Sequence, residues 1–149
     1  MYLLLLFLHS LFRWLVLISL LYAAFRAYRG YRSGSPFTKT DNALRHWTAT
    51  TAHVQLLIGI VLYAQSPVVK NAFASGRREP LFFGLIHAAI MVIAILVITI
   101  GSAMAKRKET DPEKFRTMLF WFLIALVLIF AAIPWPFSPL ANRPYFRPY

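Results

Sequence analysis

The sequence predicts an all-α integral membrane protein, folded as a four-helix bundle whose consecutive helices run up, down, up and down. The chain has 149 residues, of which 59% are hydrophobic, and its mean hydropathy is +0.60. A membrane-spanning helix needs about 20 apolar residues, and four segments are long enough. The connections between them are short, which favours antiparallel neighbours.

The four predicted spans form a single transmembrane domain within residues 1–149, and a tail rich in proline and aromatic residues follows them at 134–149. The spans cover residues 2–28, 43–65, 81–105 and 115–133.

The first two spans carry local signals at their ends. The N-terminal apolar run has no basic segment before it and no small-residue cleavage pattern, so we expect it to be retained as the first span rather than removed as a signal peptide. Asp41 or Asn42 is expected to cap the second span, and Ser66-Pro67 to end it.

The third and fourth spans are bounded by prolines. Pro80 stands just ahead of the third span, where its fixed φ is tolerated. The sequence Asp111-Pro112-Glu113 opens the fourth span with acidic side chains at the positive end of the helix dipole, and Pro134-Trp135-Pro136 ends it.

The positive charges predict the orientation, because loops rich in Lys and Arg stay in the cytoplasm. The chain has 16 Lys and Arg against 5 Asp and Glu, a net charge of +11. The loops after the first and third spans, with their edges, hold ten basic residues: Arg26, Arg29, Arg32, Lys39, Arg45, Lys106, Arg107, Lys108, Lys114 and Arg116. The second loop and the tail hold five: Lys70, Arg77, Arg78, Arg143 and Arg147. Both termini are therefore predicted to lie outside the cytoplasm.

The composition excludes several classes of function. The basic charge is explained by the span flanks, and the apolar spans are incompatible with the surface of a soluble nucleic-acid-binding protein. Cysteine is absent, so the chain has no disulfide, no thiolate metal site and no covalent attachment for a c-type haem. All five acidic residues lie outside the spans, which leaves no carboxylate within the membrane to act as a general base for an independent enzyme.

Four ionisable side chains, His9, Arg13, His53 and His87, stand out because they lie well inside the predicted spans, where such groups are costly and mark candidate functional sites. From the helical rise, His9 and His87 both lie about 10 Å below the outer face, with Arg13 one turn deeper than His9. His53 lies near the midplane. Met91 follows His87 by one turn.

Three histidines on three helices, at two neighbouring depths, match the needs of a b-type haem, which two neutral imidazoles ligate inside an apolar bundle. Depth favours His9 with His87, from diagonal helices, and His53 with His87 is the alternative. Arg13 can pair with a haem propionate. Gly84 leaves room for a porphyrin and Met91 lies at the same level, so Arg13, Gly84 and Met91 are predicted to contact about one haem b per chain.

Each histidine also has a simpler interpretation. His9 is near enough to the end of its span to hydrogen-bond water. Thr50 or Gln55 could satisfy His53, and His87 could be an ordinary packing residue.

Scattered motifs over nearly the whole chain resemble small four-span membrane proteins that are labelled cytochrome b in Bacteroidota-type bacteria. The resemblance rests on Leu8-His9-Ser10, Arg13-Trp14, His53-Val54-Gln55, Gly59, Leu62-Tyr63, Ser66-Pro67, Phe82-Phe83-Gly84, His87, Met91 and Ile133-Pro134-Trp135-Pro136-Phe137. It implies a cytochrome-b-like protein of the bacterial inner membrane. In that membrane, the orientation predicted from the basic loops places both termini on the periplasmic side. The chain lacks the four paired histidines of a two-haem transmembrane cytochrome b, so we do not expect electron transfer across the full membrane through two haems.

The expected function is electron transfer between quinol and a partner redox protein, through a haem held by intramembrane histidines. One alternative is a structural or assembly subunit, without haem, of a larger respiratory complex. The other is a transporter of metal or small solutes, in which the histidines and Met91 form a path or a copper-type site. The expected partners are the lipid bilayer, quinone or quinol, other respiratory or redox membrane subunits and further copies of the chain.

Overall fold

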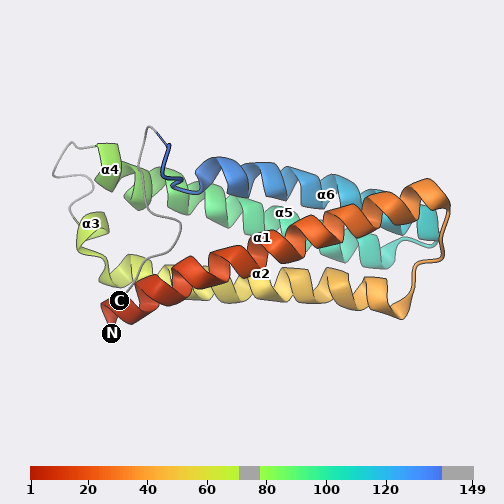
Figure 1. The fold of residues 1–149 in the computed structure, drawn as a ribbon, viewed down its shortest axis with the longest axis horizontal. Coiled ribbons are helices and arrows are strands. Elements are labelled where there is room, and N and C mark those ends of the chain that lie inside the picture. The colour runs from red at the N-terminus through yellow and green to blue at the C-terminus, as the bar shows by residue number, and fades with distance from the viewer. Residues whose placement is uncertain (71–77, 139–149) are drawn as a thin grey trace.

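The computed structural model describes residues 1–70 and 78–138, and the described chain is all-helical, which confirms the predicted fold class (Figure 1). Its long helices are α1 (Tyr2–Ser33), α2 (Lys39–Gln65), α5 (Ala88–Arg107) and α6 (Asp111–Ala132). The short helices α3 (Pro67–Lys70) and α4 (Arg78–Leu81) and the π-helical segment η1 (Phe82–His87) lie between α2 and α5. The third apolar helix extends from Glu79 to Arg107, through the end of α4, all of η1 and α5. The described residues therefore contain four helices that are long and apolar enough to cross a membrane.

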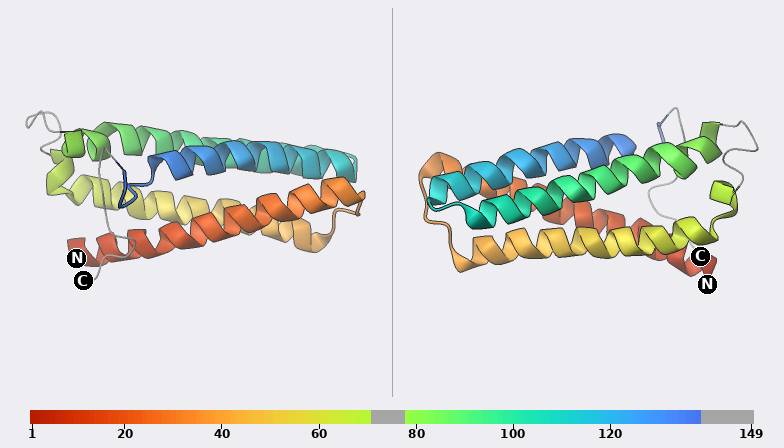
Figure 2. Two further views of the ribbon diagram at one scale, coloured as in Figure 1. Left: turned by 45° about the horizontal axis from the view of Figure 1, so that its top comes forward. Right: turned by 180° about the vertical axis from the view of Figure 1, so that it is seen from behind.

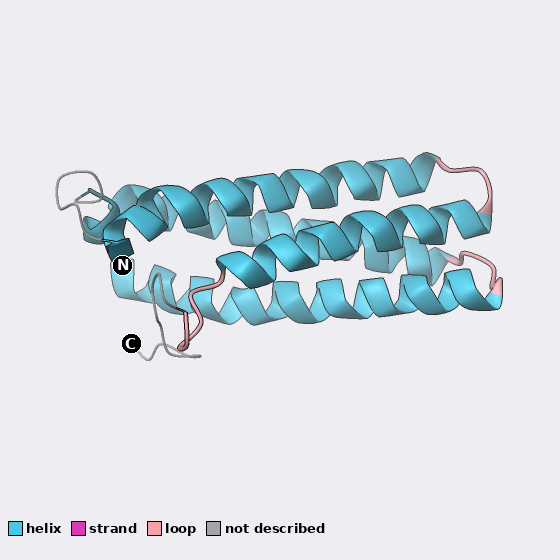
Figure 3. Ribbon diagram, turned by 90° about the horizontal axis from the view of Figure 1, so that it is seen from above, coloured by secondary structure: helices cyan, strands magenta, loops and turns pink. Residues whose placement is uncertain are grey.

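Each long helix reverses the direction of the one before it, and the helices lie side by side in every ribbon view (Figure 2). Helix α1 packs beside α2 and α6, and α5 packs beside the same two helices. Helices α1 and α5 are therefore diagonal in the bundle. The connections at 34–38 and 108–110 lie together at the end opposite the N-terminus (Figure 3), so both strongly basic loops are at one end. The basic residues Arg77, Arg143 and Arg147 lie outside the described residues, as does most of the predicted tail.

The capping residues set where the helices begin and end, and two of these ends differ from prediction. Helix α1 continues to Ser33 and stops at Gly34, which adopts a left-handed φ of 62°. Thr38 caps α2, rather than Asp41 or Asn42, because Asp41 serves as the third residue of a capping box with Thr38. Thr110 and Glu113 form the same arrangement at α6, which begins at Asp111, at the acidic sequence that was predicted to open it and four residues before the predicted span.

Most of the buried apolar core lies in the half of the bundle nearest the basic loops. Two glycines let helices approach closely there, since a Cβ on Gly30 would overlap the Phe115 ring and one on Gly101 would overlap Trp121. Buried polar groups lie at the same end. The Asp41 carboxylate, 2% exposed, pairs with Arg26 at 2.9 Å, and buried Arg45 donates to the hydroxyl and the main-chain oxygen of Ser102.

Candidate functional site

A cavity of about 380 Å³ occupies the other half of the bundle, at the end where α1 begins. The positions of the buried side chains along each helix show where close packing ends and the cavity begins. Buried side chains in α1 begin only at Val16, those within α2 stop at Ala52, and those within α5 begin at Ala94. The three helices continue past these points, so their inner faces border the cavity instead of one another.

The cavity wall is mainly apolar, with a few polar side chains that converge from different helices. These are Tyr2, His9, Ser10, Arg13, Gln55, Tyr63, Ser66 and His87. An apolar pocket with a small set of convergent polar groups is typical of ligand and cofactor sites.

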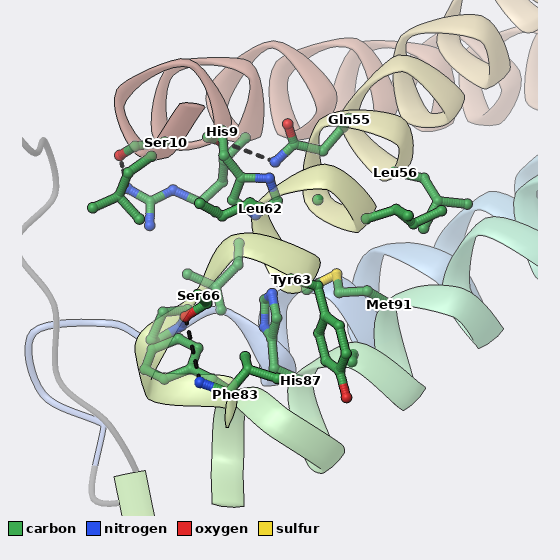
Figure 4. A pocket seen from close by; sticks show the side chains of 18 of the residues that line it. His9, Ser10, Gln55, Leu56, Leu62, Tyr63, Ser66, Phe83, His87 and Met91 are labelled. Carbon is green, nitrogen blue, oxygen red and sulfur yellow. Dashed lines mark hydrogen bonds between the residues drawn. The ribbon is translucent and has the colours of Figure 1, made fainter. Parts of the chain in front are cut away.

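His9 and His87 face one another across this cavity (Figure 4). Their ring centroids are 6.4 Å apart and the ring planes are inclined at 73°. His9 comes from α1 and His87 from the end of η1, so the two rings approach from diagonal helices. The structure thus brings together His9 and His87, the two histidines that were expected to pair because they lie at the same depth.

The orientation of His87 is set by α6. Its Nδ1 atom lies 2.8 Å from the main-chain oxygen of Ala132. A carbonyl oxygen can only accept, so Nδ1 carries the proton and donates. In the neutral imidazole this leaves Nε2 with a free lone pair, the form that ligates a metal. The rings of Phe82 and Phe83 lie 5.8 and 6.0 Å from the imidazole and pack around it.

The prolines after α6 explain why the Ala132 oxygen is available. A helix continuing past Ala132 would bond this oxygen to the N–H of residue 136, but Pro136 has none. Pro134 likewise cannot bond the oxygen of Phe130, which instead accepts from Trp135 Nε1 at 2.8 Å. The motif that ends the helix therefore frees the acceptor that orients His87.

His87 is the last residue of the π-helical segment η1. Such segments hold an extra residue per turn and occur often at functional sites. Tyr63 of α2 donates its hydroxyl to the main-chain oxygen of Gly84, within η1, at 2.8 Å. Gly84 is buried and contributes this carbonyl rather than a cavity wall, which differs from its predicted role as space for a porphyrin. No residue pattern in the sequence predicted the π segment.

His9 lies against α2. Gln55 donates its side-chain nitrogen to the main-chain oxygen of His9 at 2.9 Å. One turn later, a Cβ on Gly59 would lie 3.2 Å from His9 Cε1, so glycine leaves room for the ring. The Nδ1 atom of His9 is buried and has no hydrogen-bond partner among the described residues. A buried polar atom without a partner is uncommon and calls for an unseen ligand, ion or water.

Two further predicted residues border the cavity. Arg13, one turn from His9, donates to the Ser10 hydroxyl at 3.4 Å and lies 5.4 Å from the centre of the Trp14 ring. Met91 also lines the cavity, one turn after His87. The guanidinium places a positive charge in an otherwise apolar wall.

His53 does not reach the cavity. Its side chain is exposed on the outside of the bundle, and its Nε2 lies 3.1 Å from the Thr99 hydroxyl. That hydroxyl donates to the Ile95 oxygen at 2.7 Å, so Nε2 is the donor to Thr99. Thr99 lies about 18 Å further along the helix than His87. The pairing of His53 with His87 therefore has no geometric basis, and Thr99, rather than Thr50 or Gln55, satisfies the ring.

Nothing in the described part of the chain gathers three or more His, Asp or Glu residues into a metal site. Among the described residues that line it, the cavity offers two imidazoles and no carboxylate. Comparison of the chain with protein-family models, with curated proteins and with solved structures found no match.

Proposed function

We propose that this multi-pass membrane protein is a b-type cytochrome that holds one haem between His9 and His87 and transfers electrons within the membrane. One observation carries the proposal. The rings of His9 and His87 face one another in the cavity, with their centroids 6.4 Å apart. Two imidazoles that bind one metal from opposite sides, with bonds of about 2 Å, have ring centroids about 6 Å apart.

The ligand number favours haem over a bare metal ion. A protein-bound zinc ion normally takes three or four side-chain ligands, and the cavity supplies two imidazoles. A porphyrin brings four nitrogen ligands of its own, so the imidazoles of His9 and His87 would be sufficient to hold its iron. The cavity volume falls within the range of about 300–1,000 Å³ that is usual for small-molecule and cofactor pockets.

The residues of the chain have separate roles in this proposal. His87 presents Nε2, because Ala132 holds the proton on its Nδ1. His9 supplies the opposing imidazole, which lies in the space that Gly59 leaves. Arg13 is positioned on the wall to pair with a propionate, and Met91 contributes apolar contact. When bound, the haem iron supplies reversible one-electron chemistry, and the apolar wall keeps water away from it.

The proposal extends to the setting of the protein. The two strongly basic loops lie at the end away from the cavity. If they are cytoplasmic, as the positive-inside rule predicts, the haem lies toward the outer face of a bacterial inner membrane, with both termini periplasmic. Quinol dissolved in the bilayer is the electron donor we infer, and a partner redox protein or respiratory subunit is the acceptor.

The test is the visible spectrum of the full chain, purified in detergent and supplied with haem. We expect a sharp α-band in the reduced-minus-oxidised spectrum and about one haem b per chain in a pyridine haemochrome assay. A featureless spectrum from folded, haem-supplied protein would remove the proposal and favour a structural subunit without haem.

A further inference from the structure

Two buried polar atoms without hydrogen-bond partners belong to the same cavity wall. They are Nδ1 of His9 and the side-chain oxygen Oε1 of Gln55, and neither has a partner among the described residues. An imidazole Nδ1–H donates, and an amide oxygen only accepts. The two orphan atoms are therefore complementary in kind.

The orientation of the Gln55 amide is fixed by a neighbouring bond. Its nitrogen donates to the main-chain oxygen of His9 at 2.9 Å (Figure 4). Because that oxygen cannot donate, the amide cannot be turned over without losing the bond. Gln55 is thus anchored beside His9 with its oxygen left unpaired.

We propose that Gln55 is a positioning residue for His9, and that its side-chain oxygen accepts the His9 Nδ1–H, directly or through one water, when His9 Nε2 binds the haem iron. This inference rests on the proposed haem function. Gln55 would then accept the Nδ1–H of His9, as the main-chain oxygen of Ala132 accepts the Nδ1–H of His87 at 2.8 Å. Ligating histidines almost always donate their second N–H in this way.

The two acceptors differ in origin. The Ala132 oxygen belongs to the main chain, so no substitution at that position removes it. The Gln55 oxygen belongs to a side chain, and it can be deleted. An acceptor on Nδ1–H makes the imidazole a stronger donor to iron and so favours the ferric state. Removing the acceptor should therefore raise the midpoint potential.

The experiment compares haem-loaded full-length protein with Gln55→Leu and Gln55→Glu, by redox titration and by electron paramagnetic resonance of the ferric form. Leucine removes both hydrogen bonds. A protonated glutamic acid can keep both, with one oxygen as donor to His9 O and the other as acceptor. We expect a higher midpoint potential and altered ferric g-values in Gln55→Leu, and a potential no higher than wild type in Gln55→Glu. Loss of haem from the leucine variant alone would also support the inference.

Thr51→Val is the matched control, because the Thr51 hydroxyl bonds to the Trp47 oxygen on the exposed side of the same helix. Its potential should equal that of the wild type. If wild type binds haem but Gln55→Leu has the same potential and g-values, the inference about Gln55 is wrong and the haem function stands. Loss of haem from both Gln55 variants, while their haem-free forms melt like wild type, would also overturn it. If wild type binds no haem, both proposals fall.

Discussion

The Nδ1 atom of His87 donates a hydrogen bond of 2.8 Å to the main-chain oxygen of Ala132, so a side chain at the start of the third span is oriented by the end of the fourth. The oxygen is free because Pro136 has no N–H to offer it. The bond leaves Nε2 of the neutral ring as the atom able to bind a metal. His9 faces this ring across the cavity with a buried Nδ1 that has no partner among the described residues.

Gly59→Ala should weaken haem binding. The added methyl group would lie 3.2 Å from His9 Cε1, so the ring must move by a few tenths of an ångström. We expect haem affinity to fall several-fold, measured by haem titration, with little change in the melting temperature of the haem-free protein. Gly101→Ala is the contrasting variant. Its methyl group would overlap Trp121 in the packed half, and it should cost about 1–3 kcal/mol of stability. Unchanged haem affinity in Gly59→Ala would contradict the placement of His9.

Arg13→Leu should reduce the haem content of purified protein, because it removes the positive charge from the cavity wall. Arg13→Lys keeps a charge without the planar fork that pairs with a carboxylate through two bonds, so it should retain more haem than leucine and less than wild type. Haem per chain is the measurement. Arg29→Leu, near the far end of α1, is the control and should keep full haem content. Equal content in Arg13→Leu and wild type would show that Arg13 does not hold the cofactor.

Asp41→Ala should destabilise the bundle without touching the cavity. The buried carboxylate accepts from Arg26 and from the main-chain nitrogen and hydroxyl of Thr38, at 2.9, 2.9 and 2.8 Å. Losing the hydrogen bonds of a buried carboxylate should cost about 1.5–3 kcal/mol, because the remaining partner Arg26 is 30% exposed and can be solvated. Unfolding in a mixed detergent series measures the loss. Asp111→Ala removes the more exposed pair with Lys114, which solvent screens, and should cost much less stability than Asp41→Ala. Equal losses would contradict the importance of the buried network.

The orientation can be measured because the chain contains no cysteine. Single substitutions Glu109→Cys, between α5 and α6, and Lys70→Cys, at the cavity end, both lie at exposed positions. A membrane-impermeant maleimide added to intact spheroplasts should label Cys at position 70 and label position 109 only after the membrane is opened. The reverse pattern would place the cavity toward the cytoplasm.

The spans were predictable from sequence because a run of about 20 apolar residues has few other stable environments than a bilayer. The meeting of His9 and His87 was predictable for a related reason, since both lie at one depth on diagonal helices. Depth follows from counting residues along a helix.

The direction in which each side chain points was harder to predict than its depth. His53 lies at a plausible depth, yet the rotation of α2 turns it outward to Thr99, and rotation depends on packing against all neighbouring helices. The π-helical turns at Phe82–His87 rotate the following side chains further, and no residue type in the sequence indicates such turns. The cap at Thr38 was missed for a local reason, because Asp41 can serve equally well as cap or as the third residue of a capping box.

Haem stoichiometry in a set of histidine variants tests the central claim most directly. His9→Ala, His87→Ala and His53→Ala would each be purified in detergent, supplied with haem and assayed by pyridine haemochrome, with circular dichroism to verify helical folding. The account predicts that His9→Ala and His87→Ala each lose the sharp α-band and most of the haem, and that His53→Ala keeps about one haem per chain. Retention of wild-type haem by folded His9→Ala or His87→Ala, or its loss in His53→Ala alone, would contradict it.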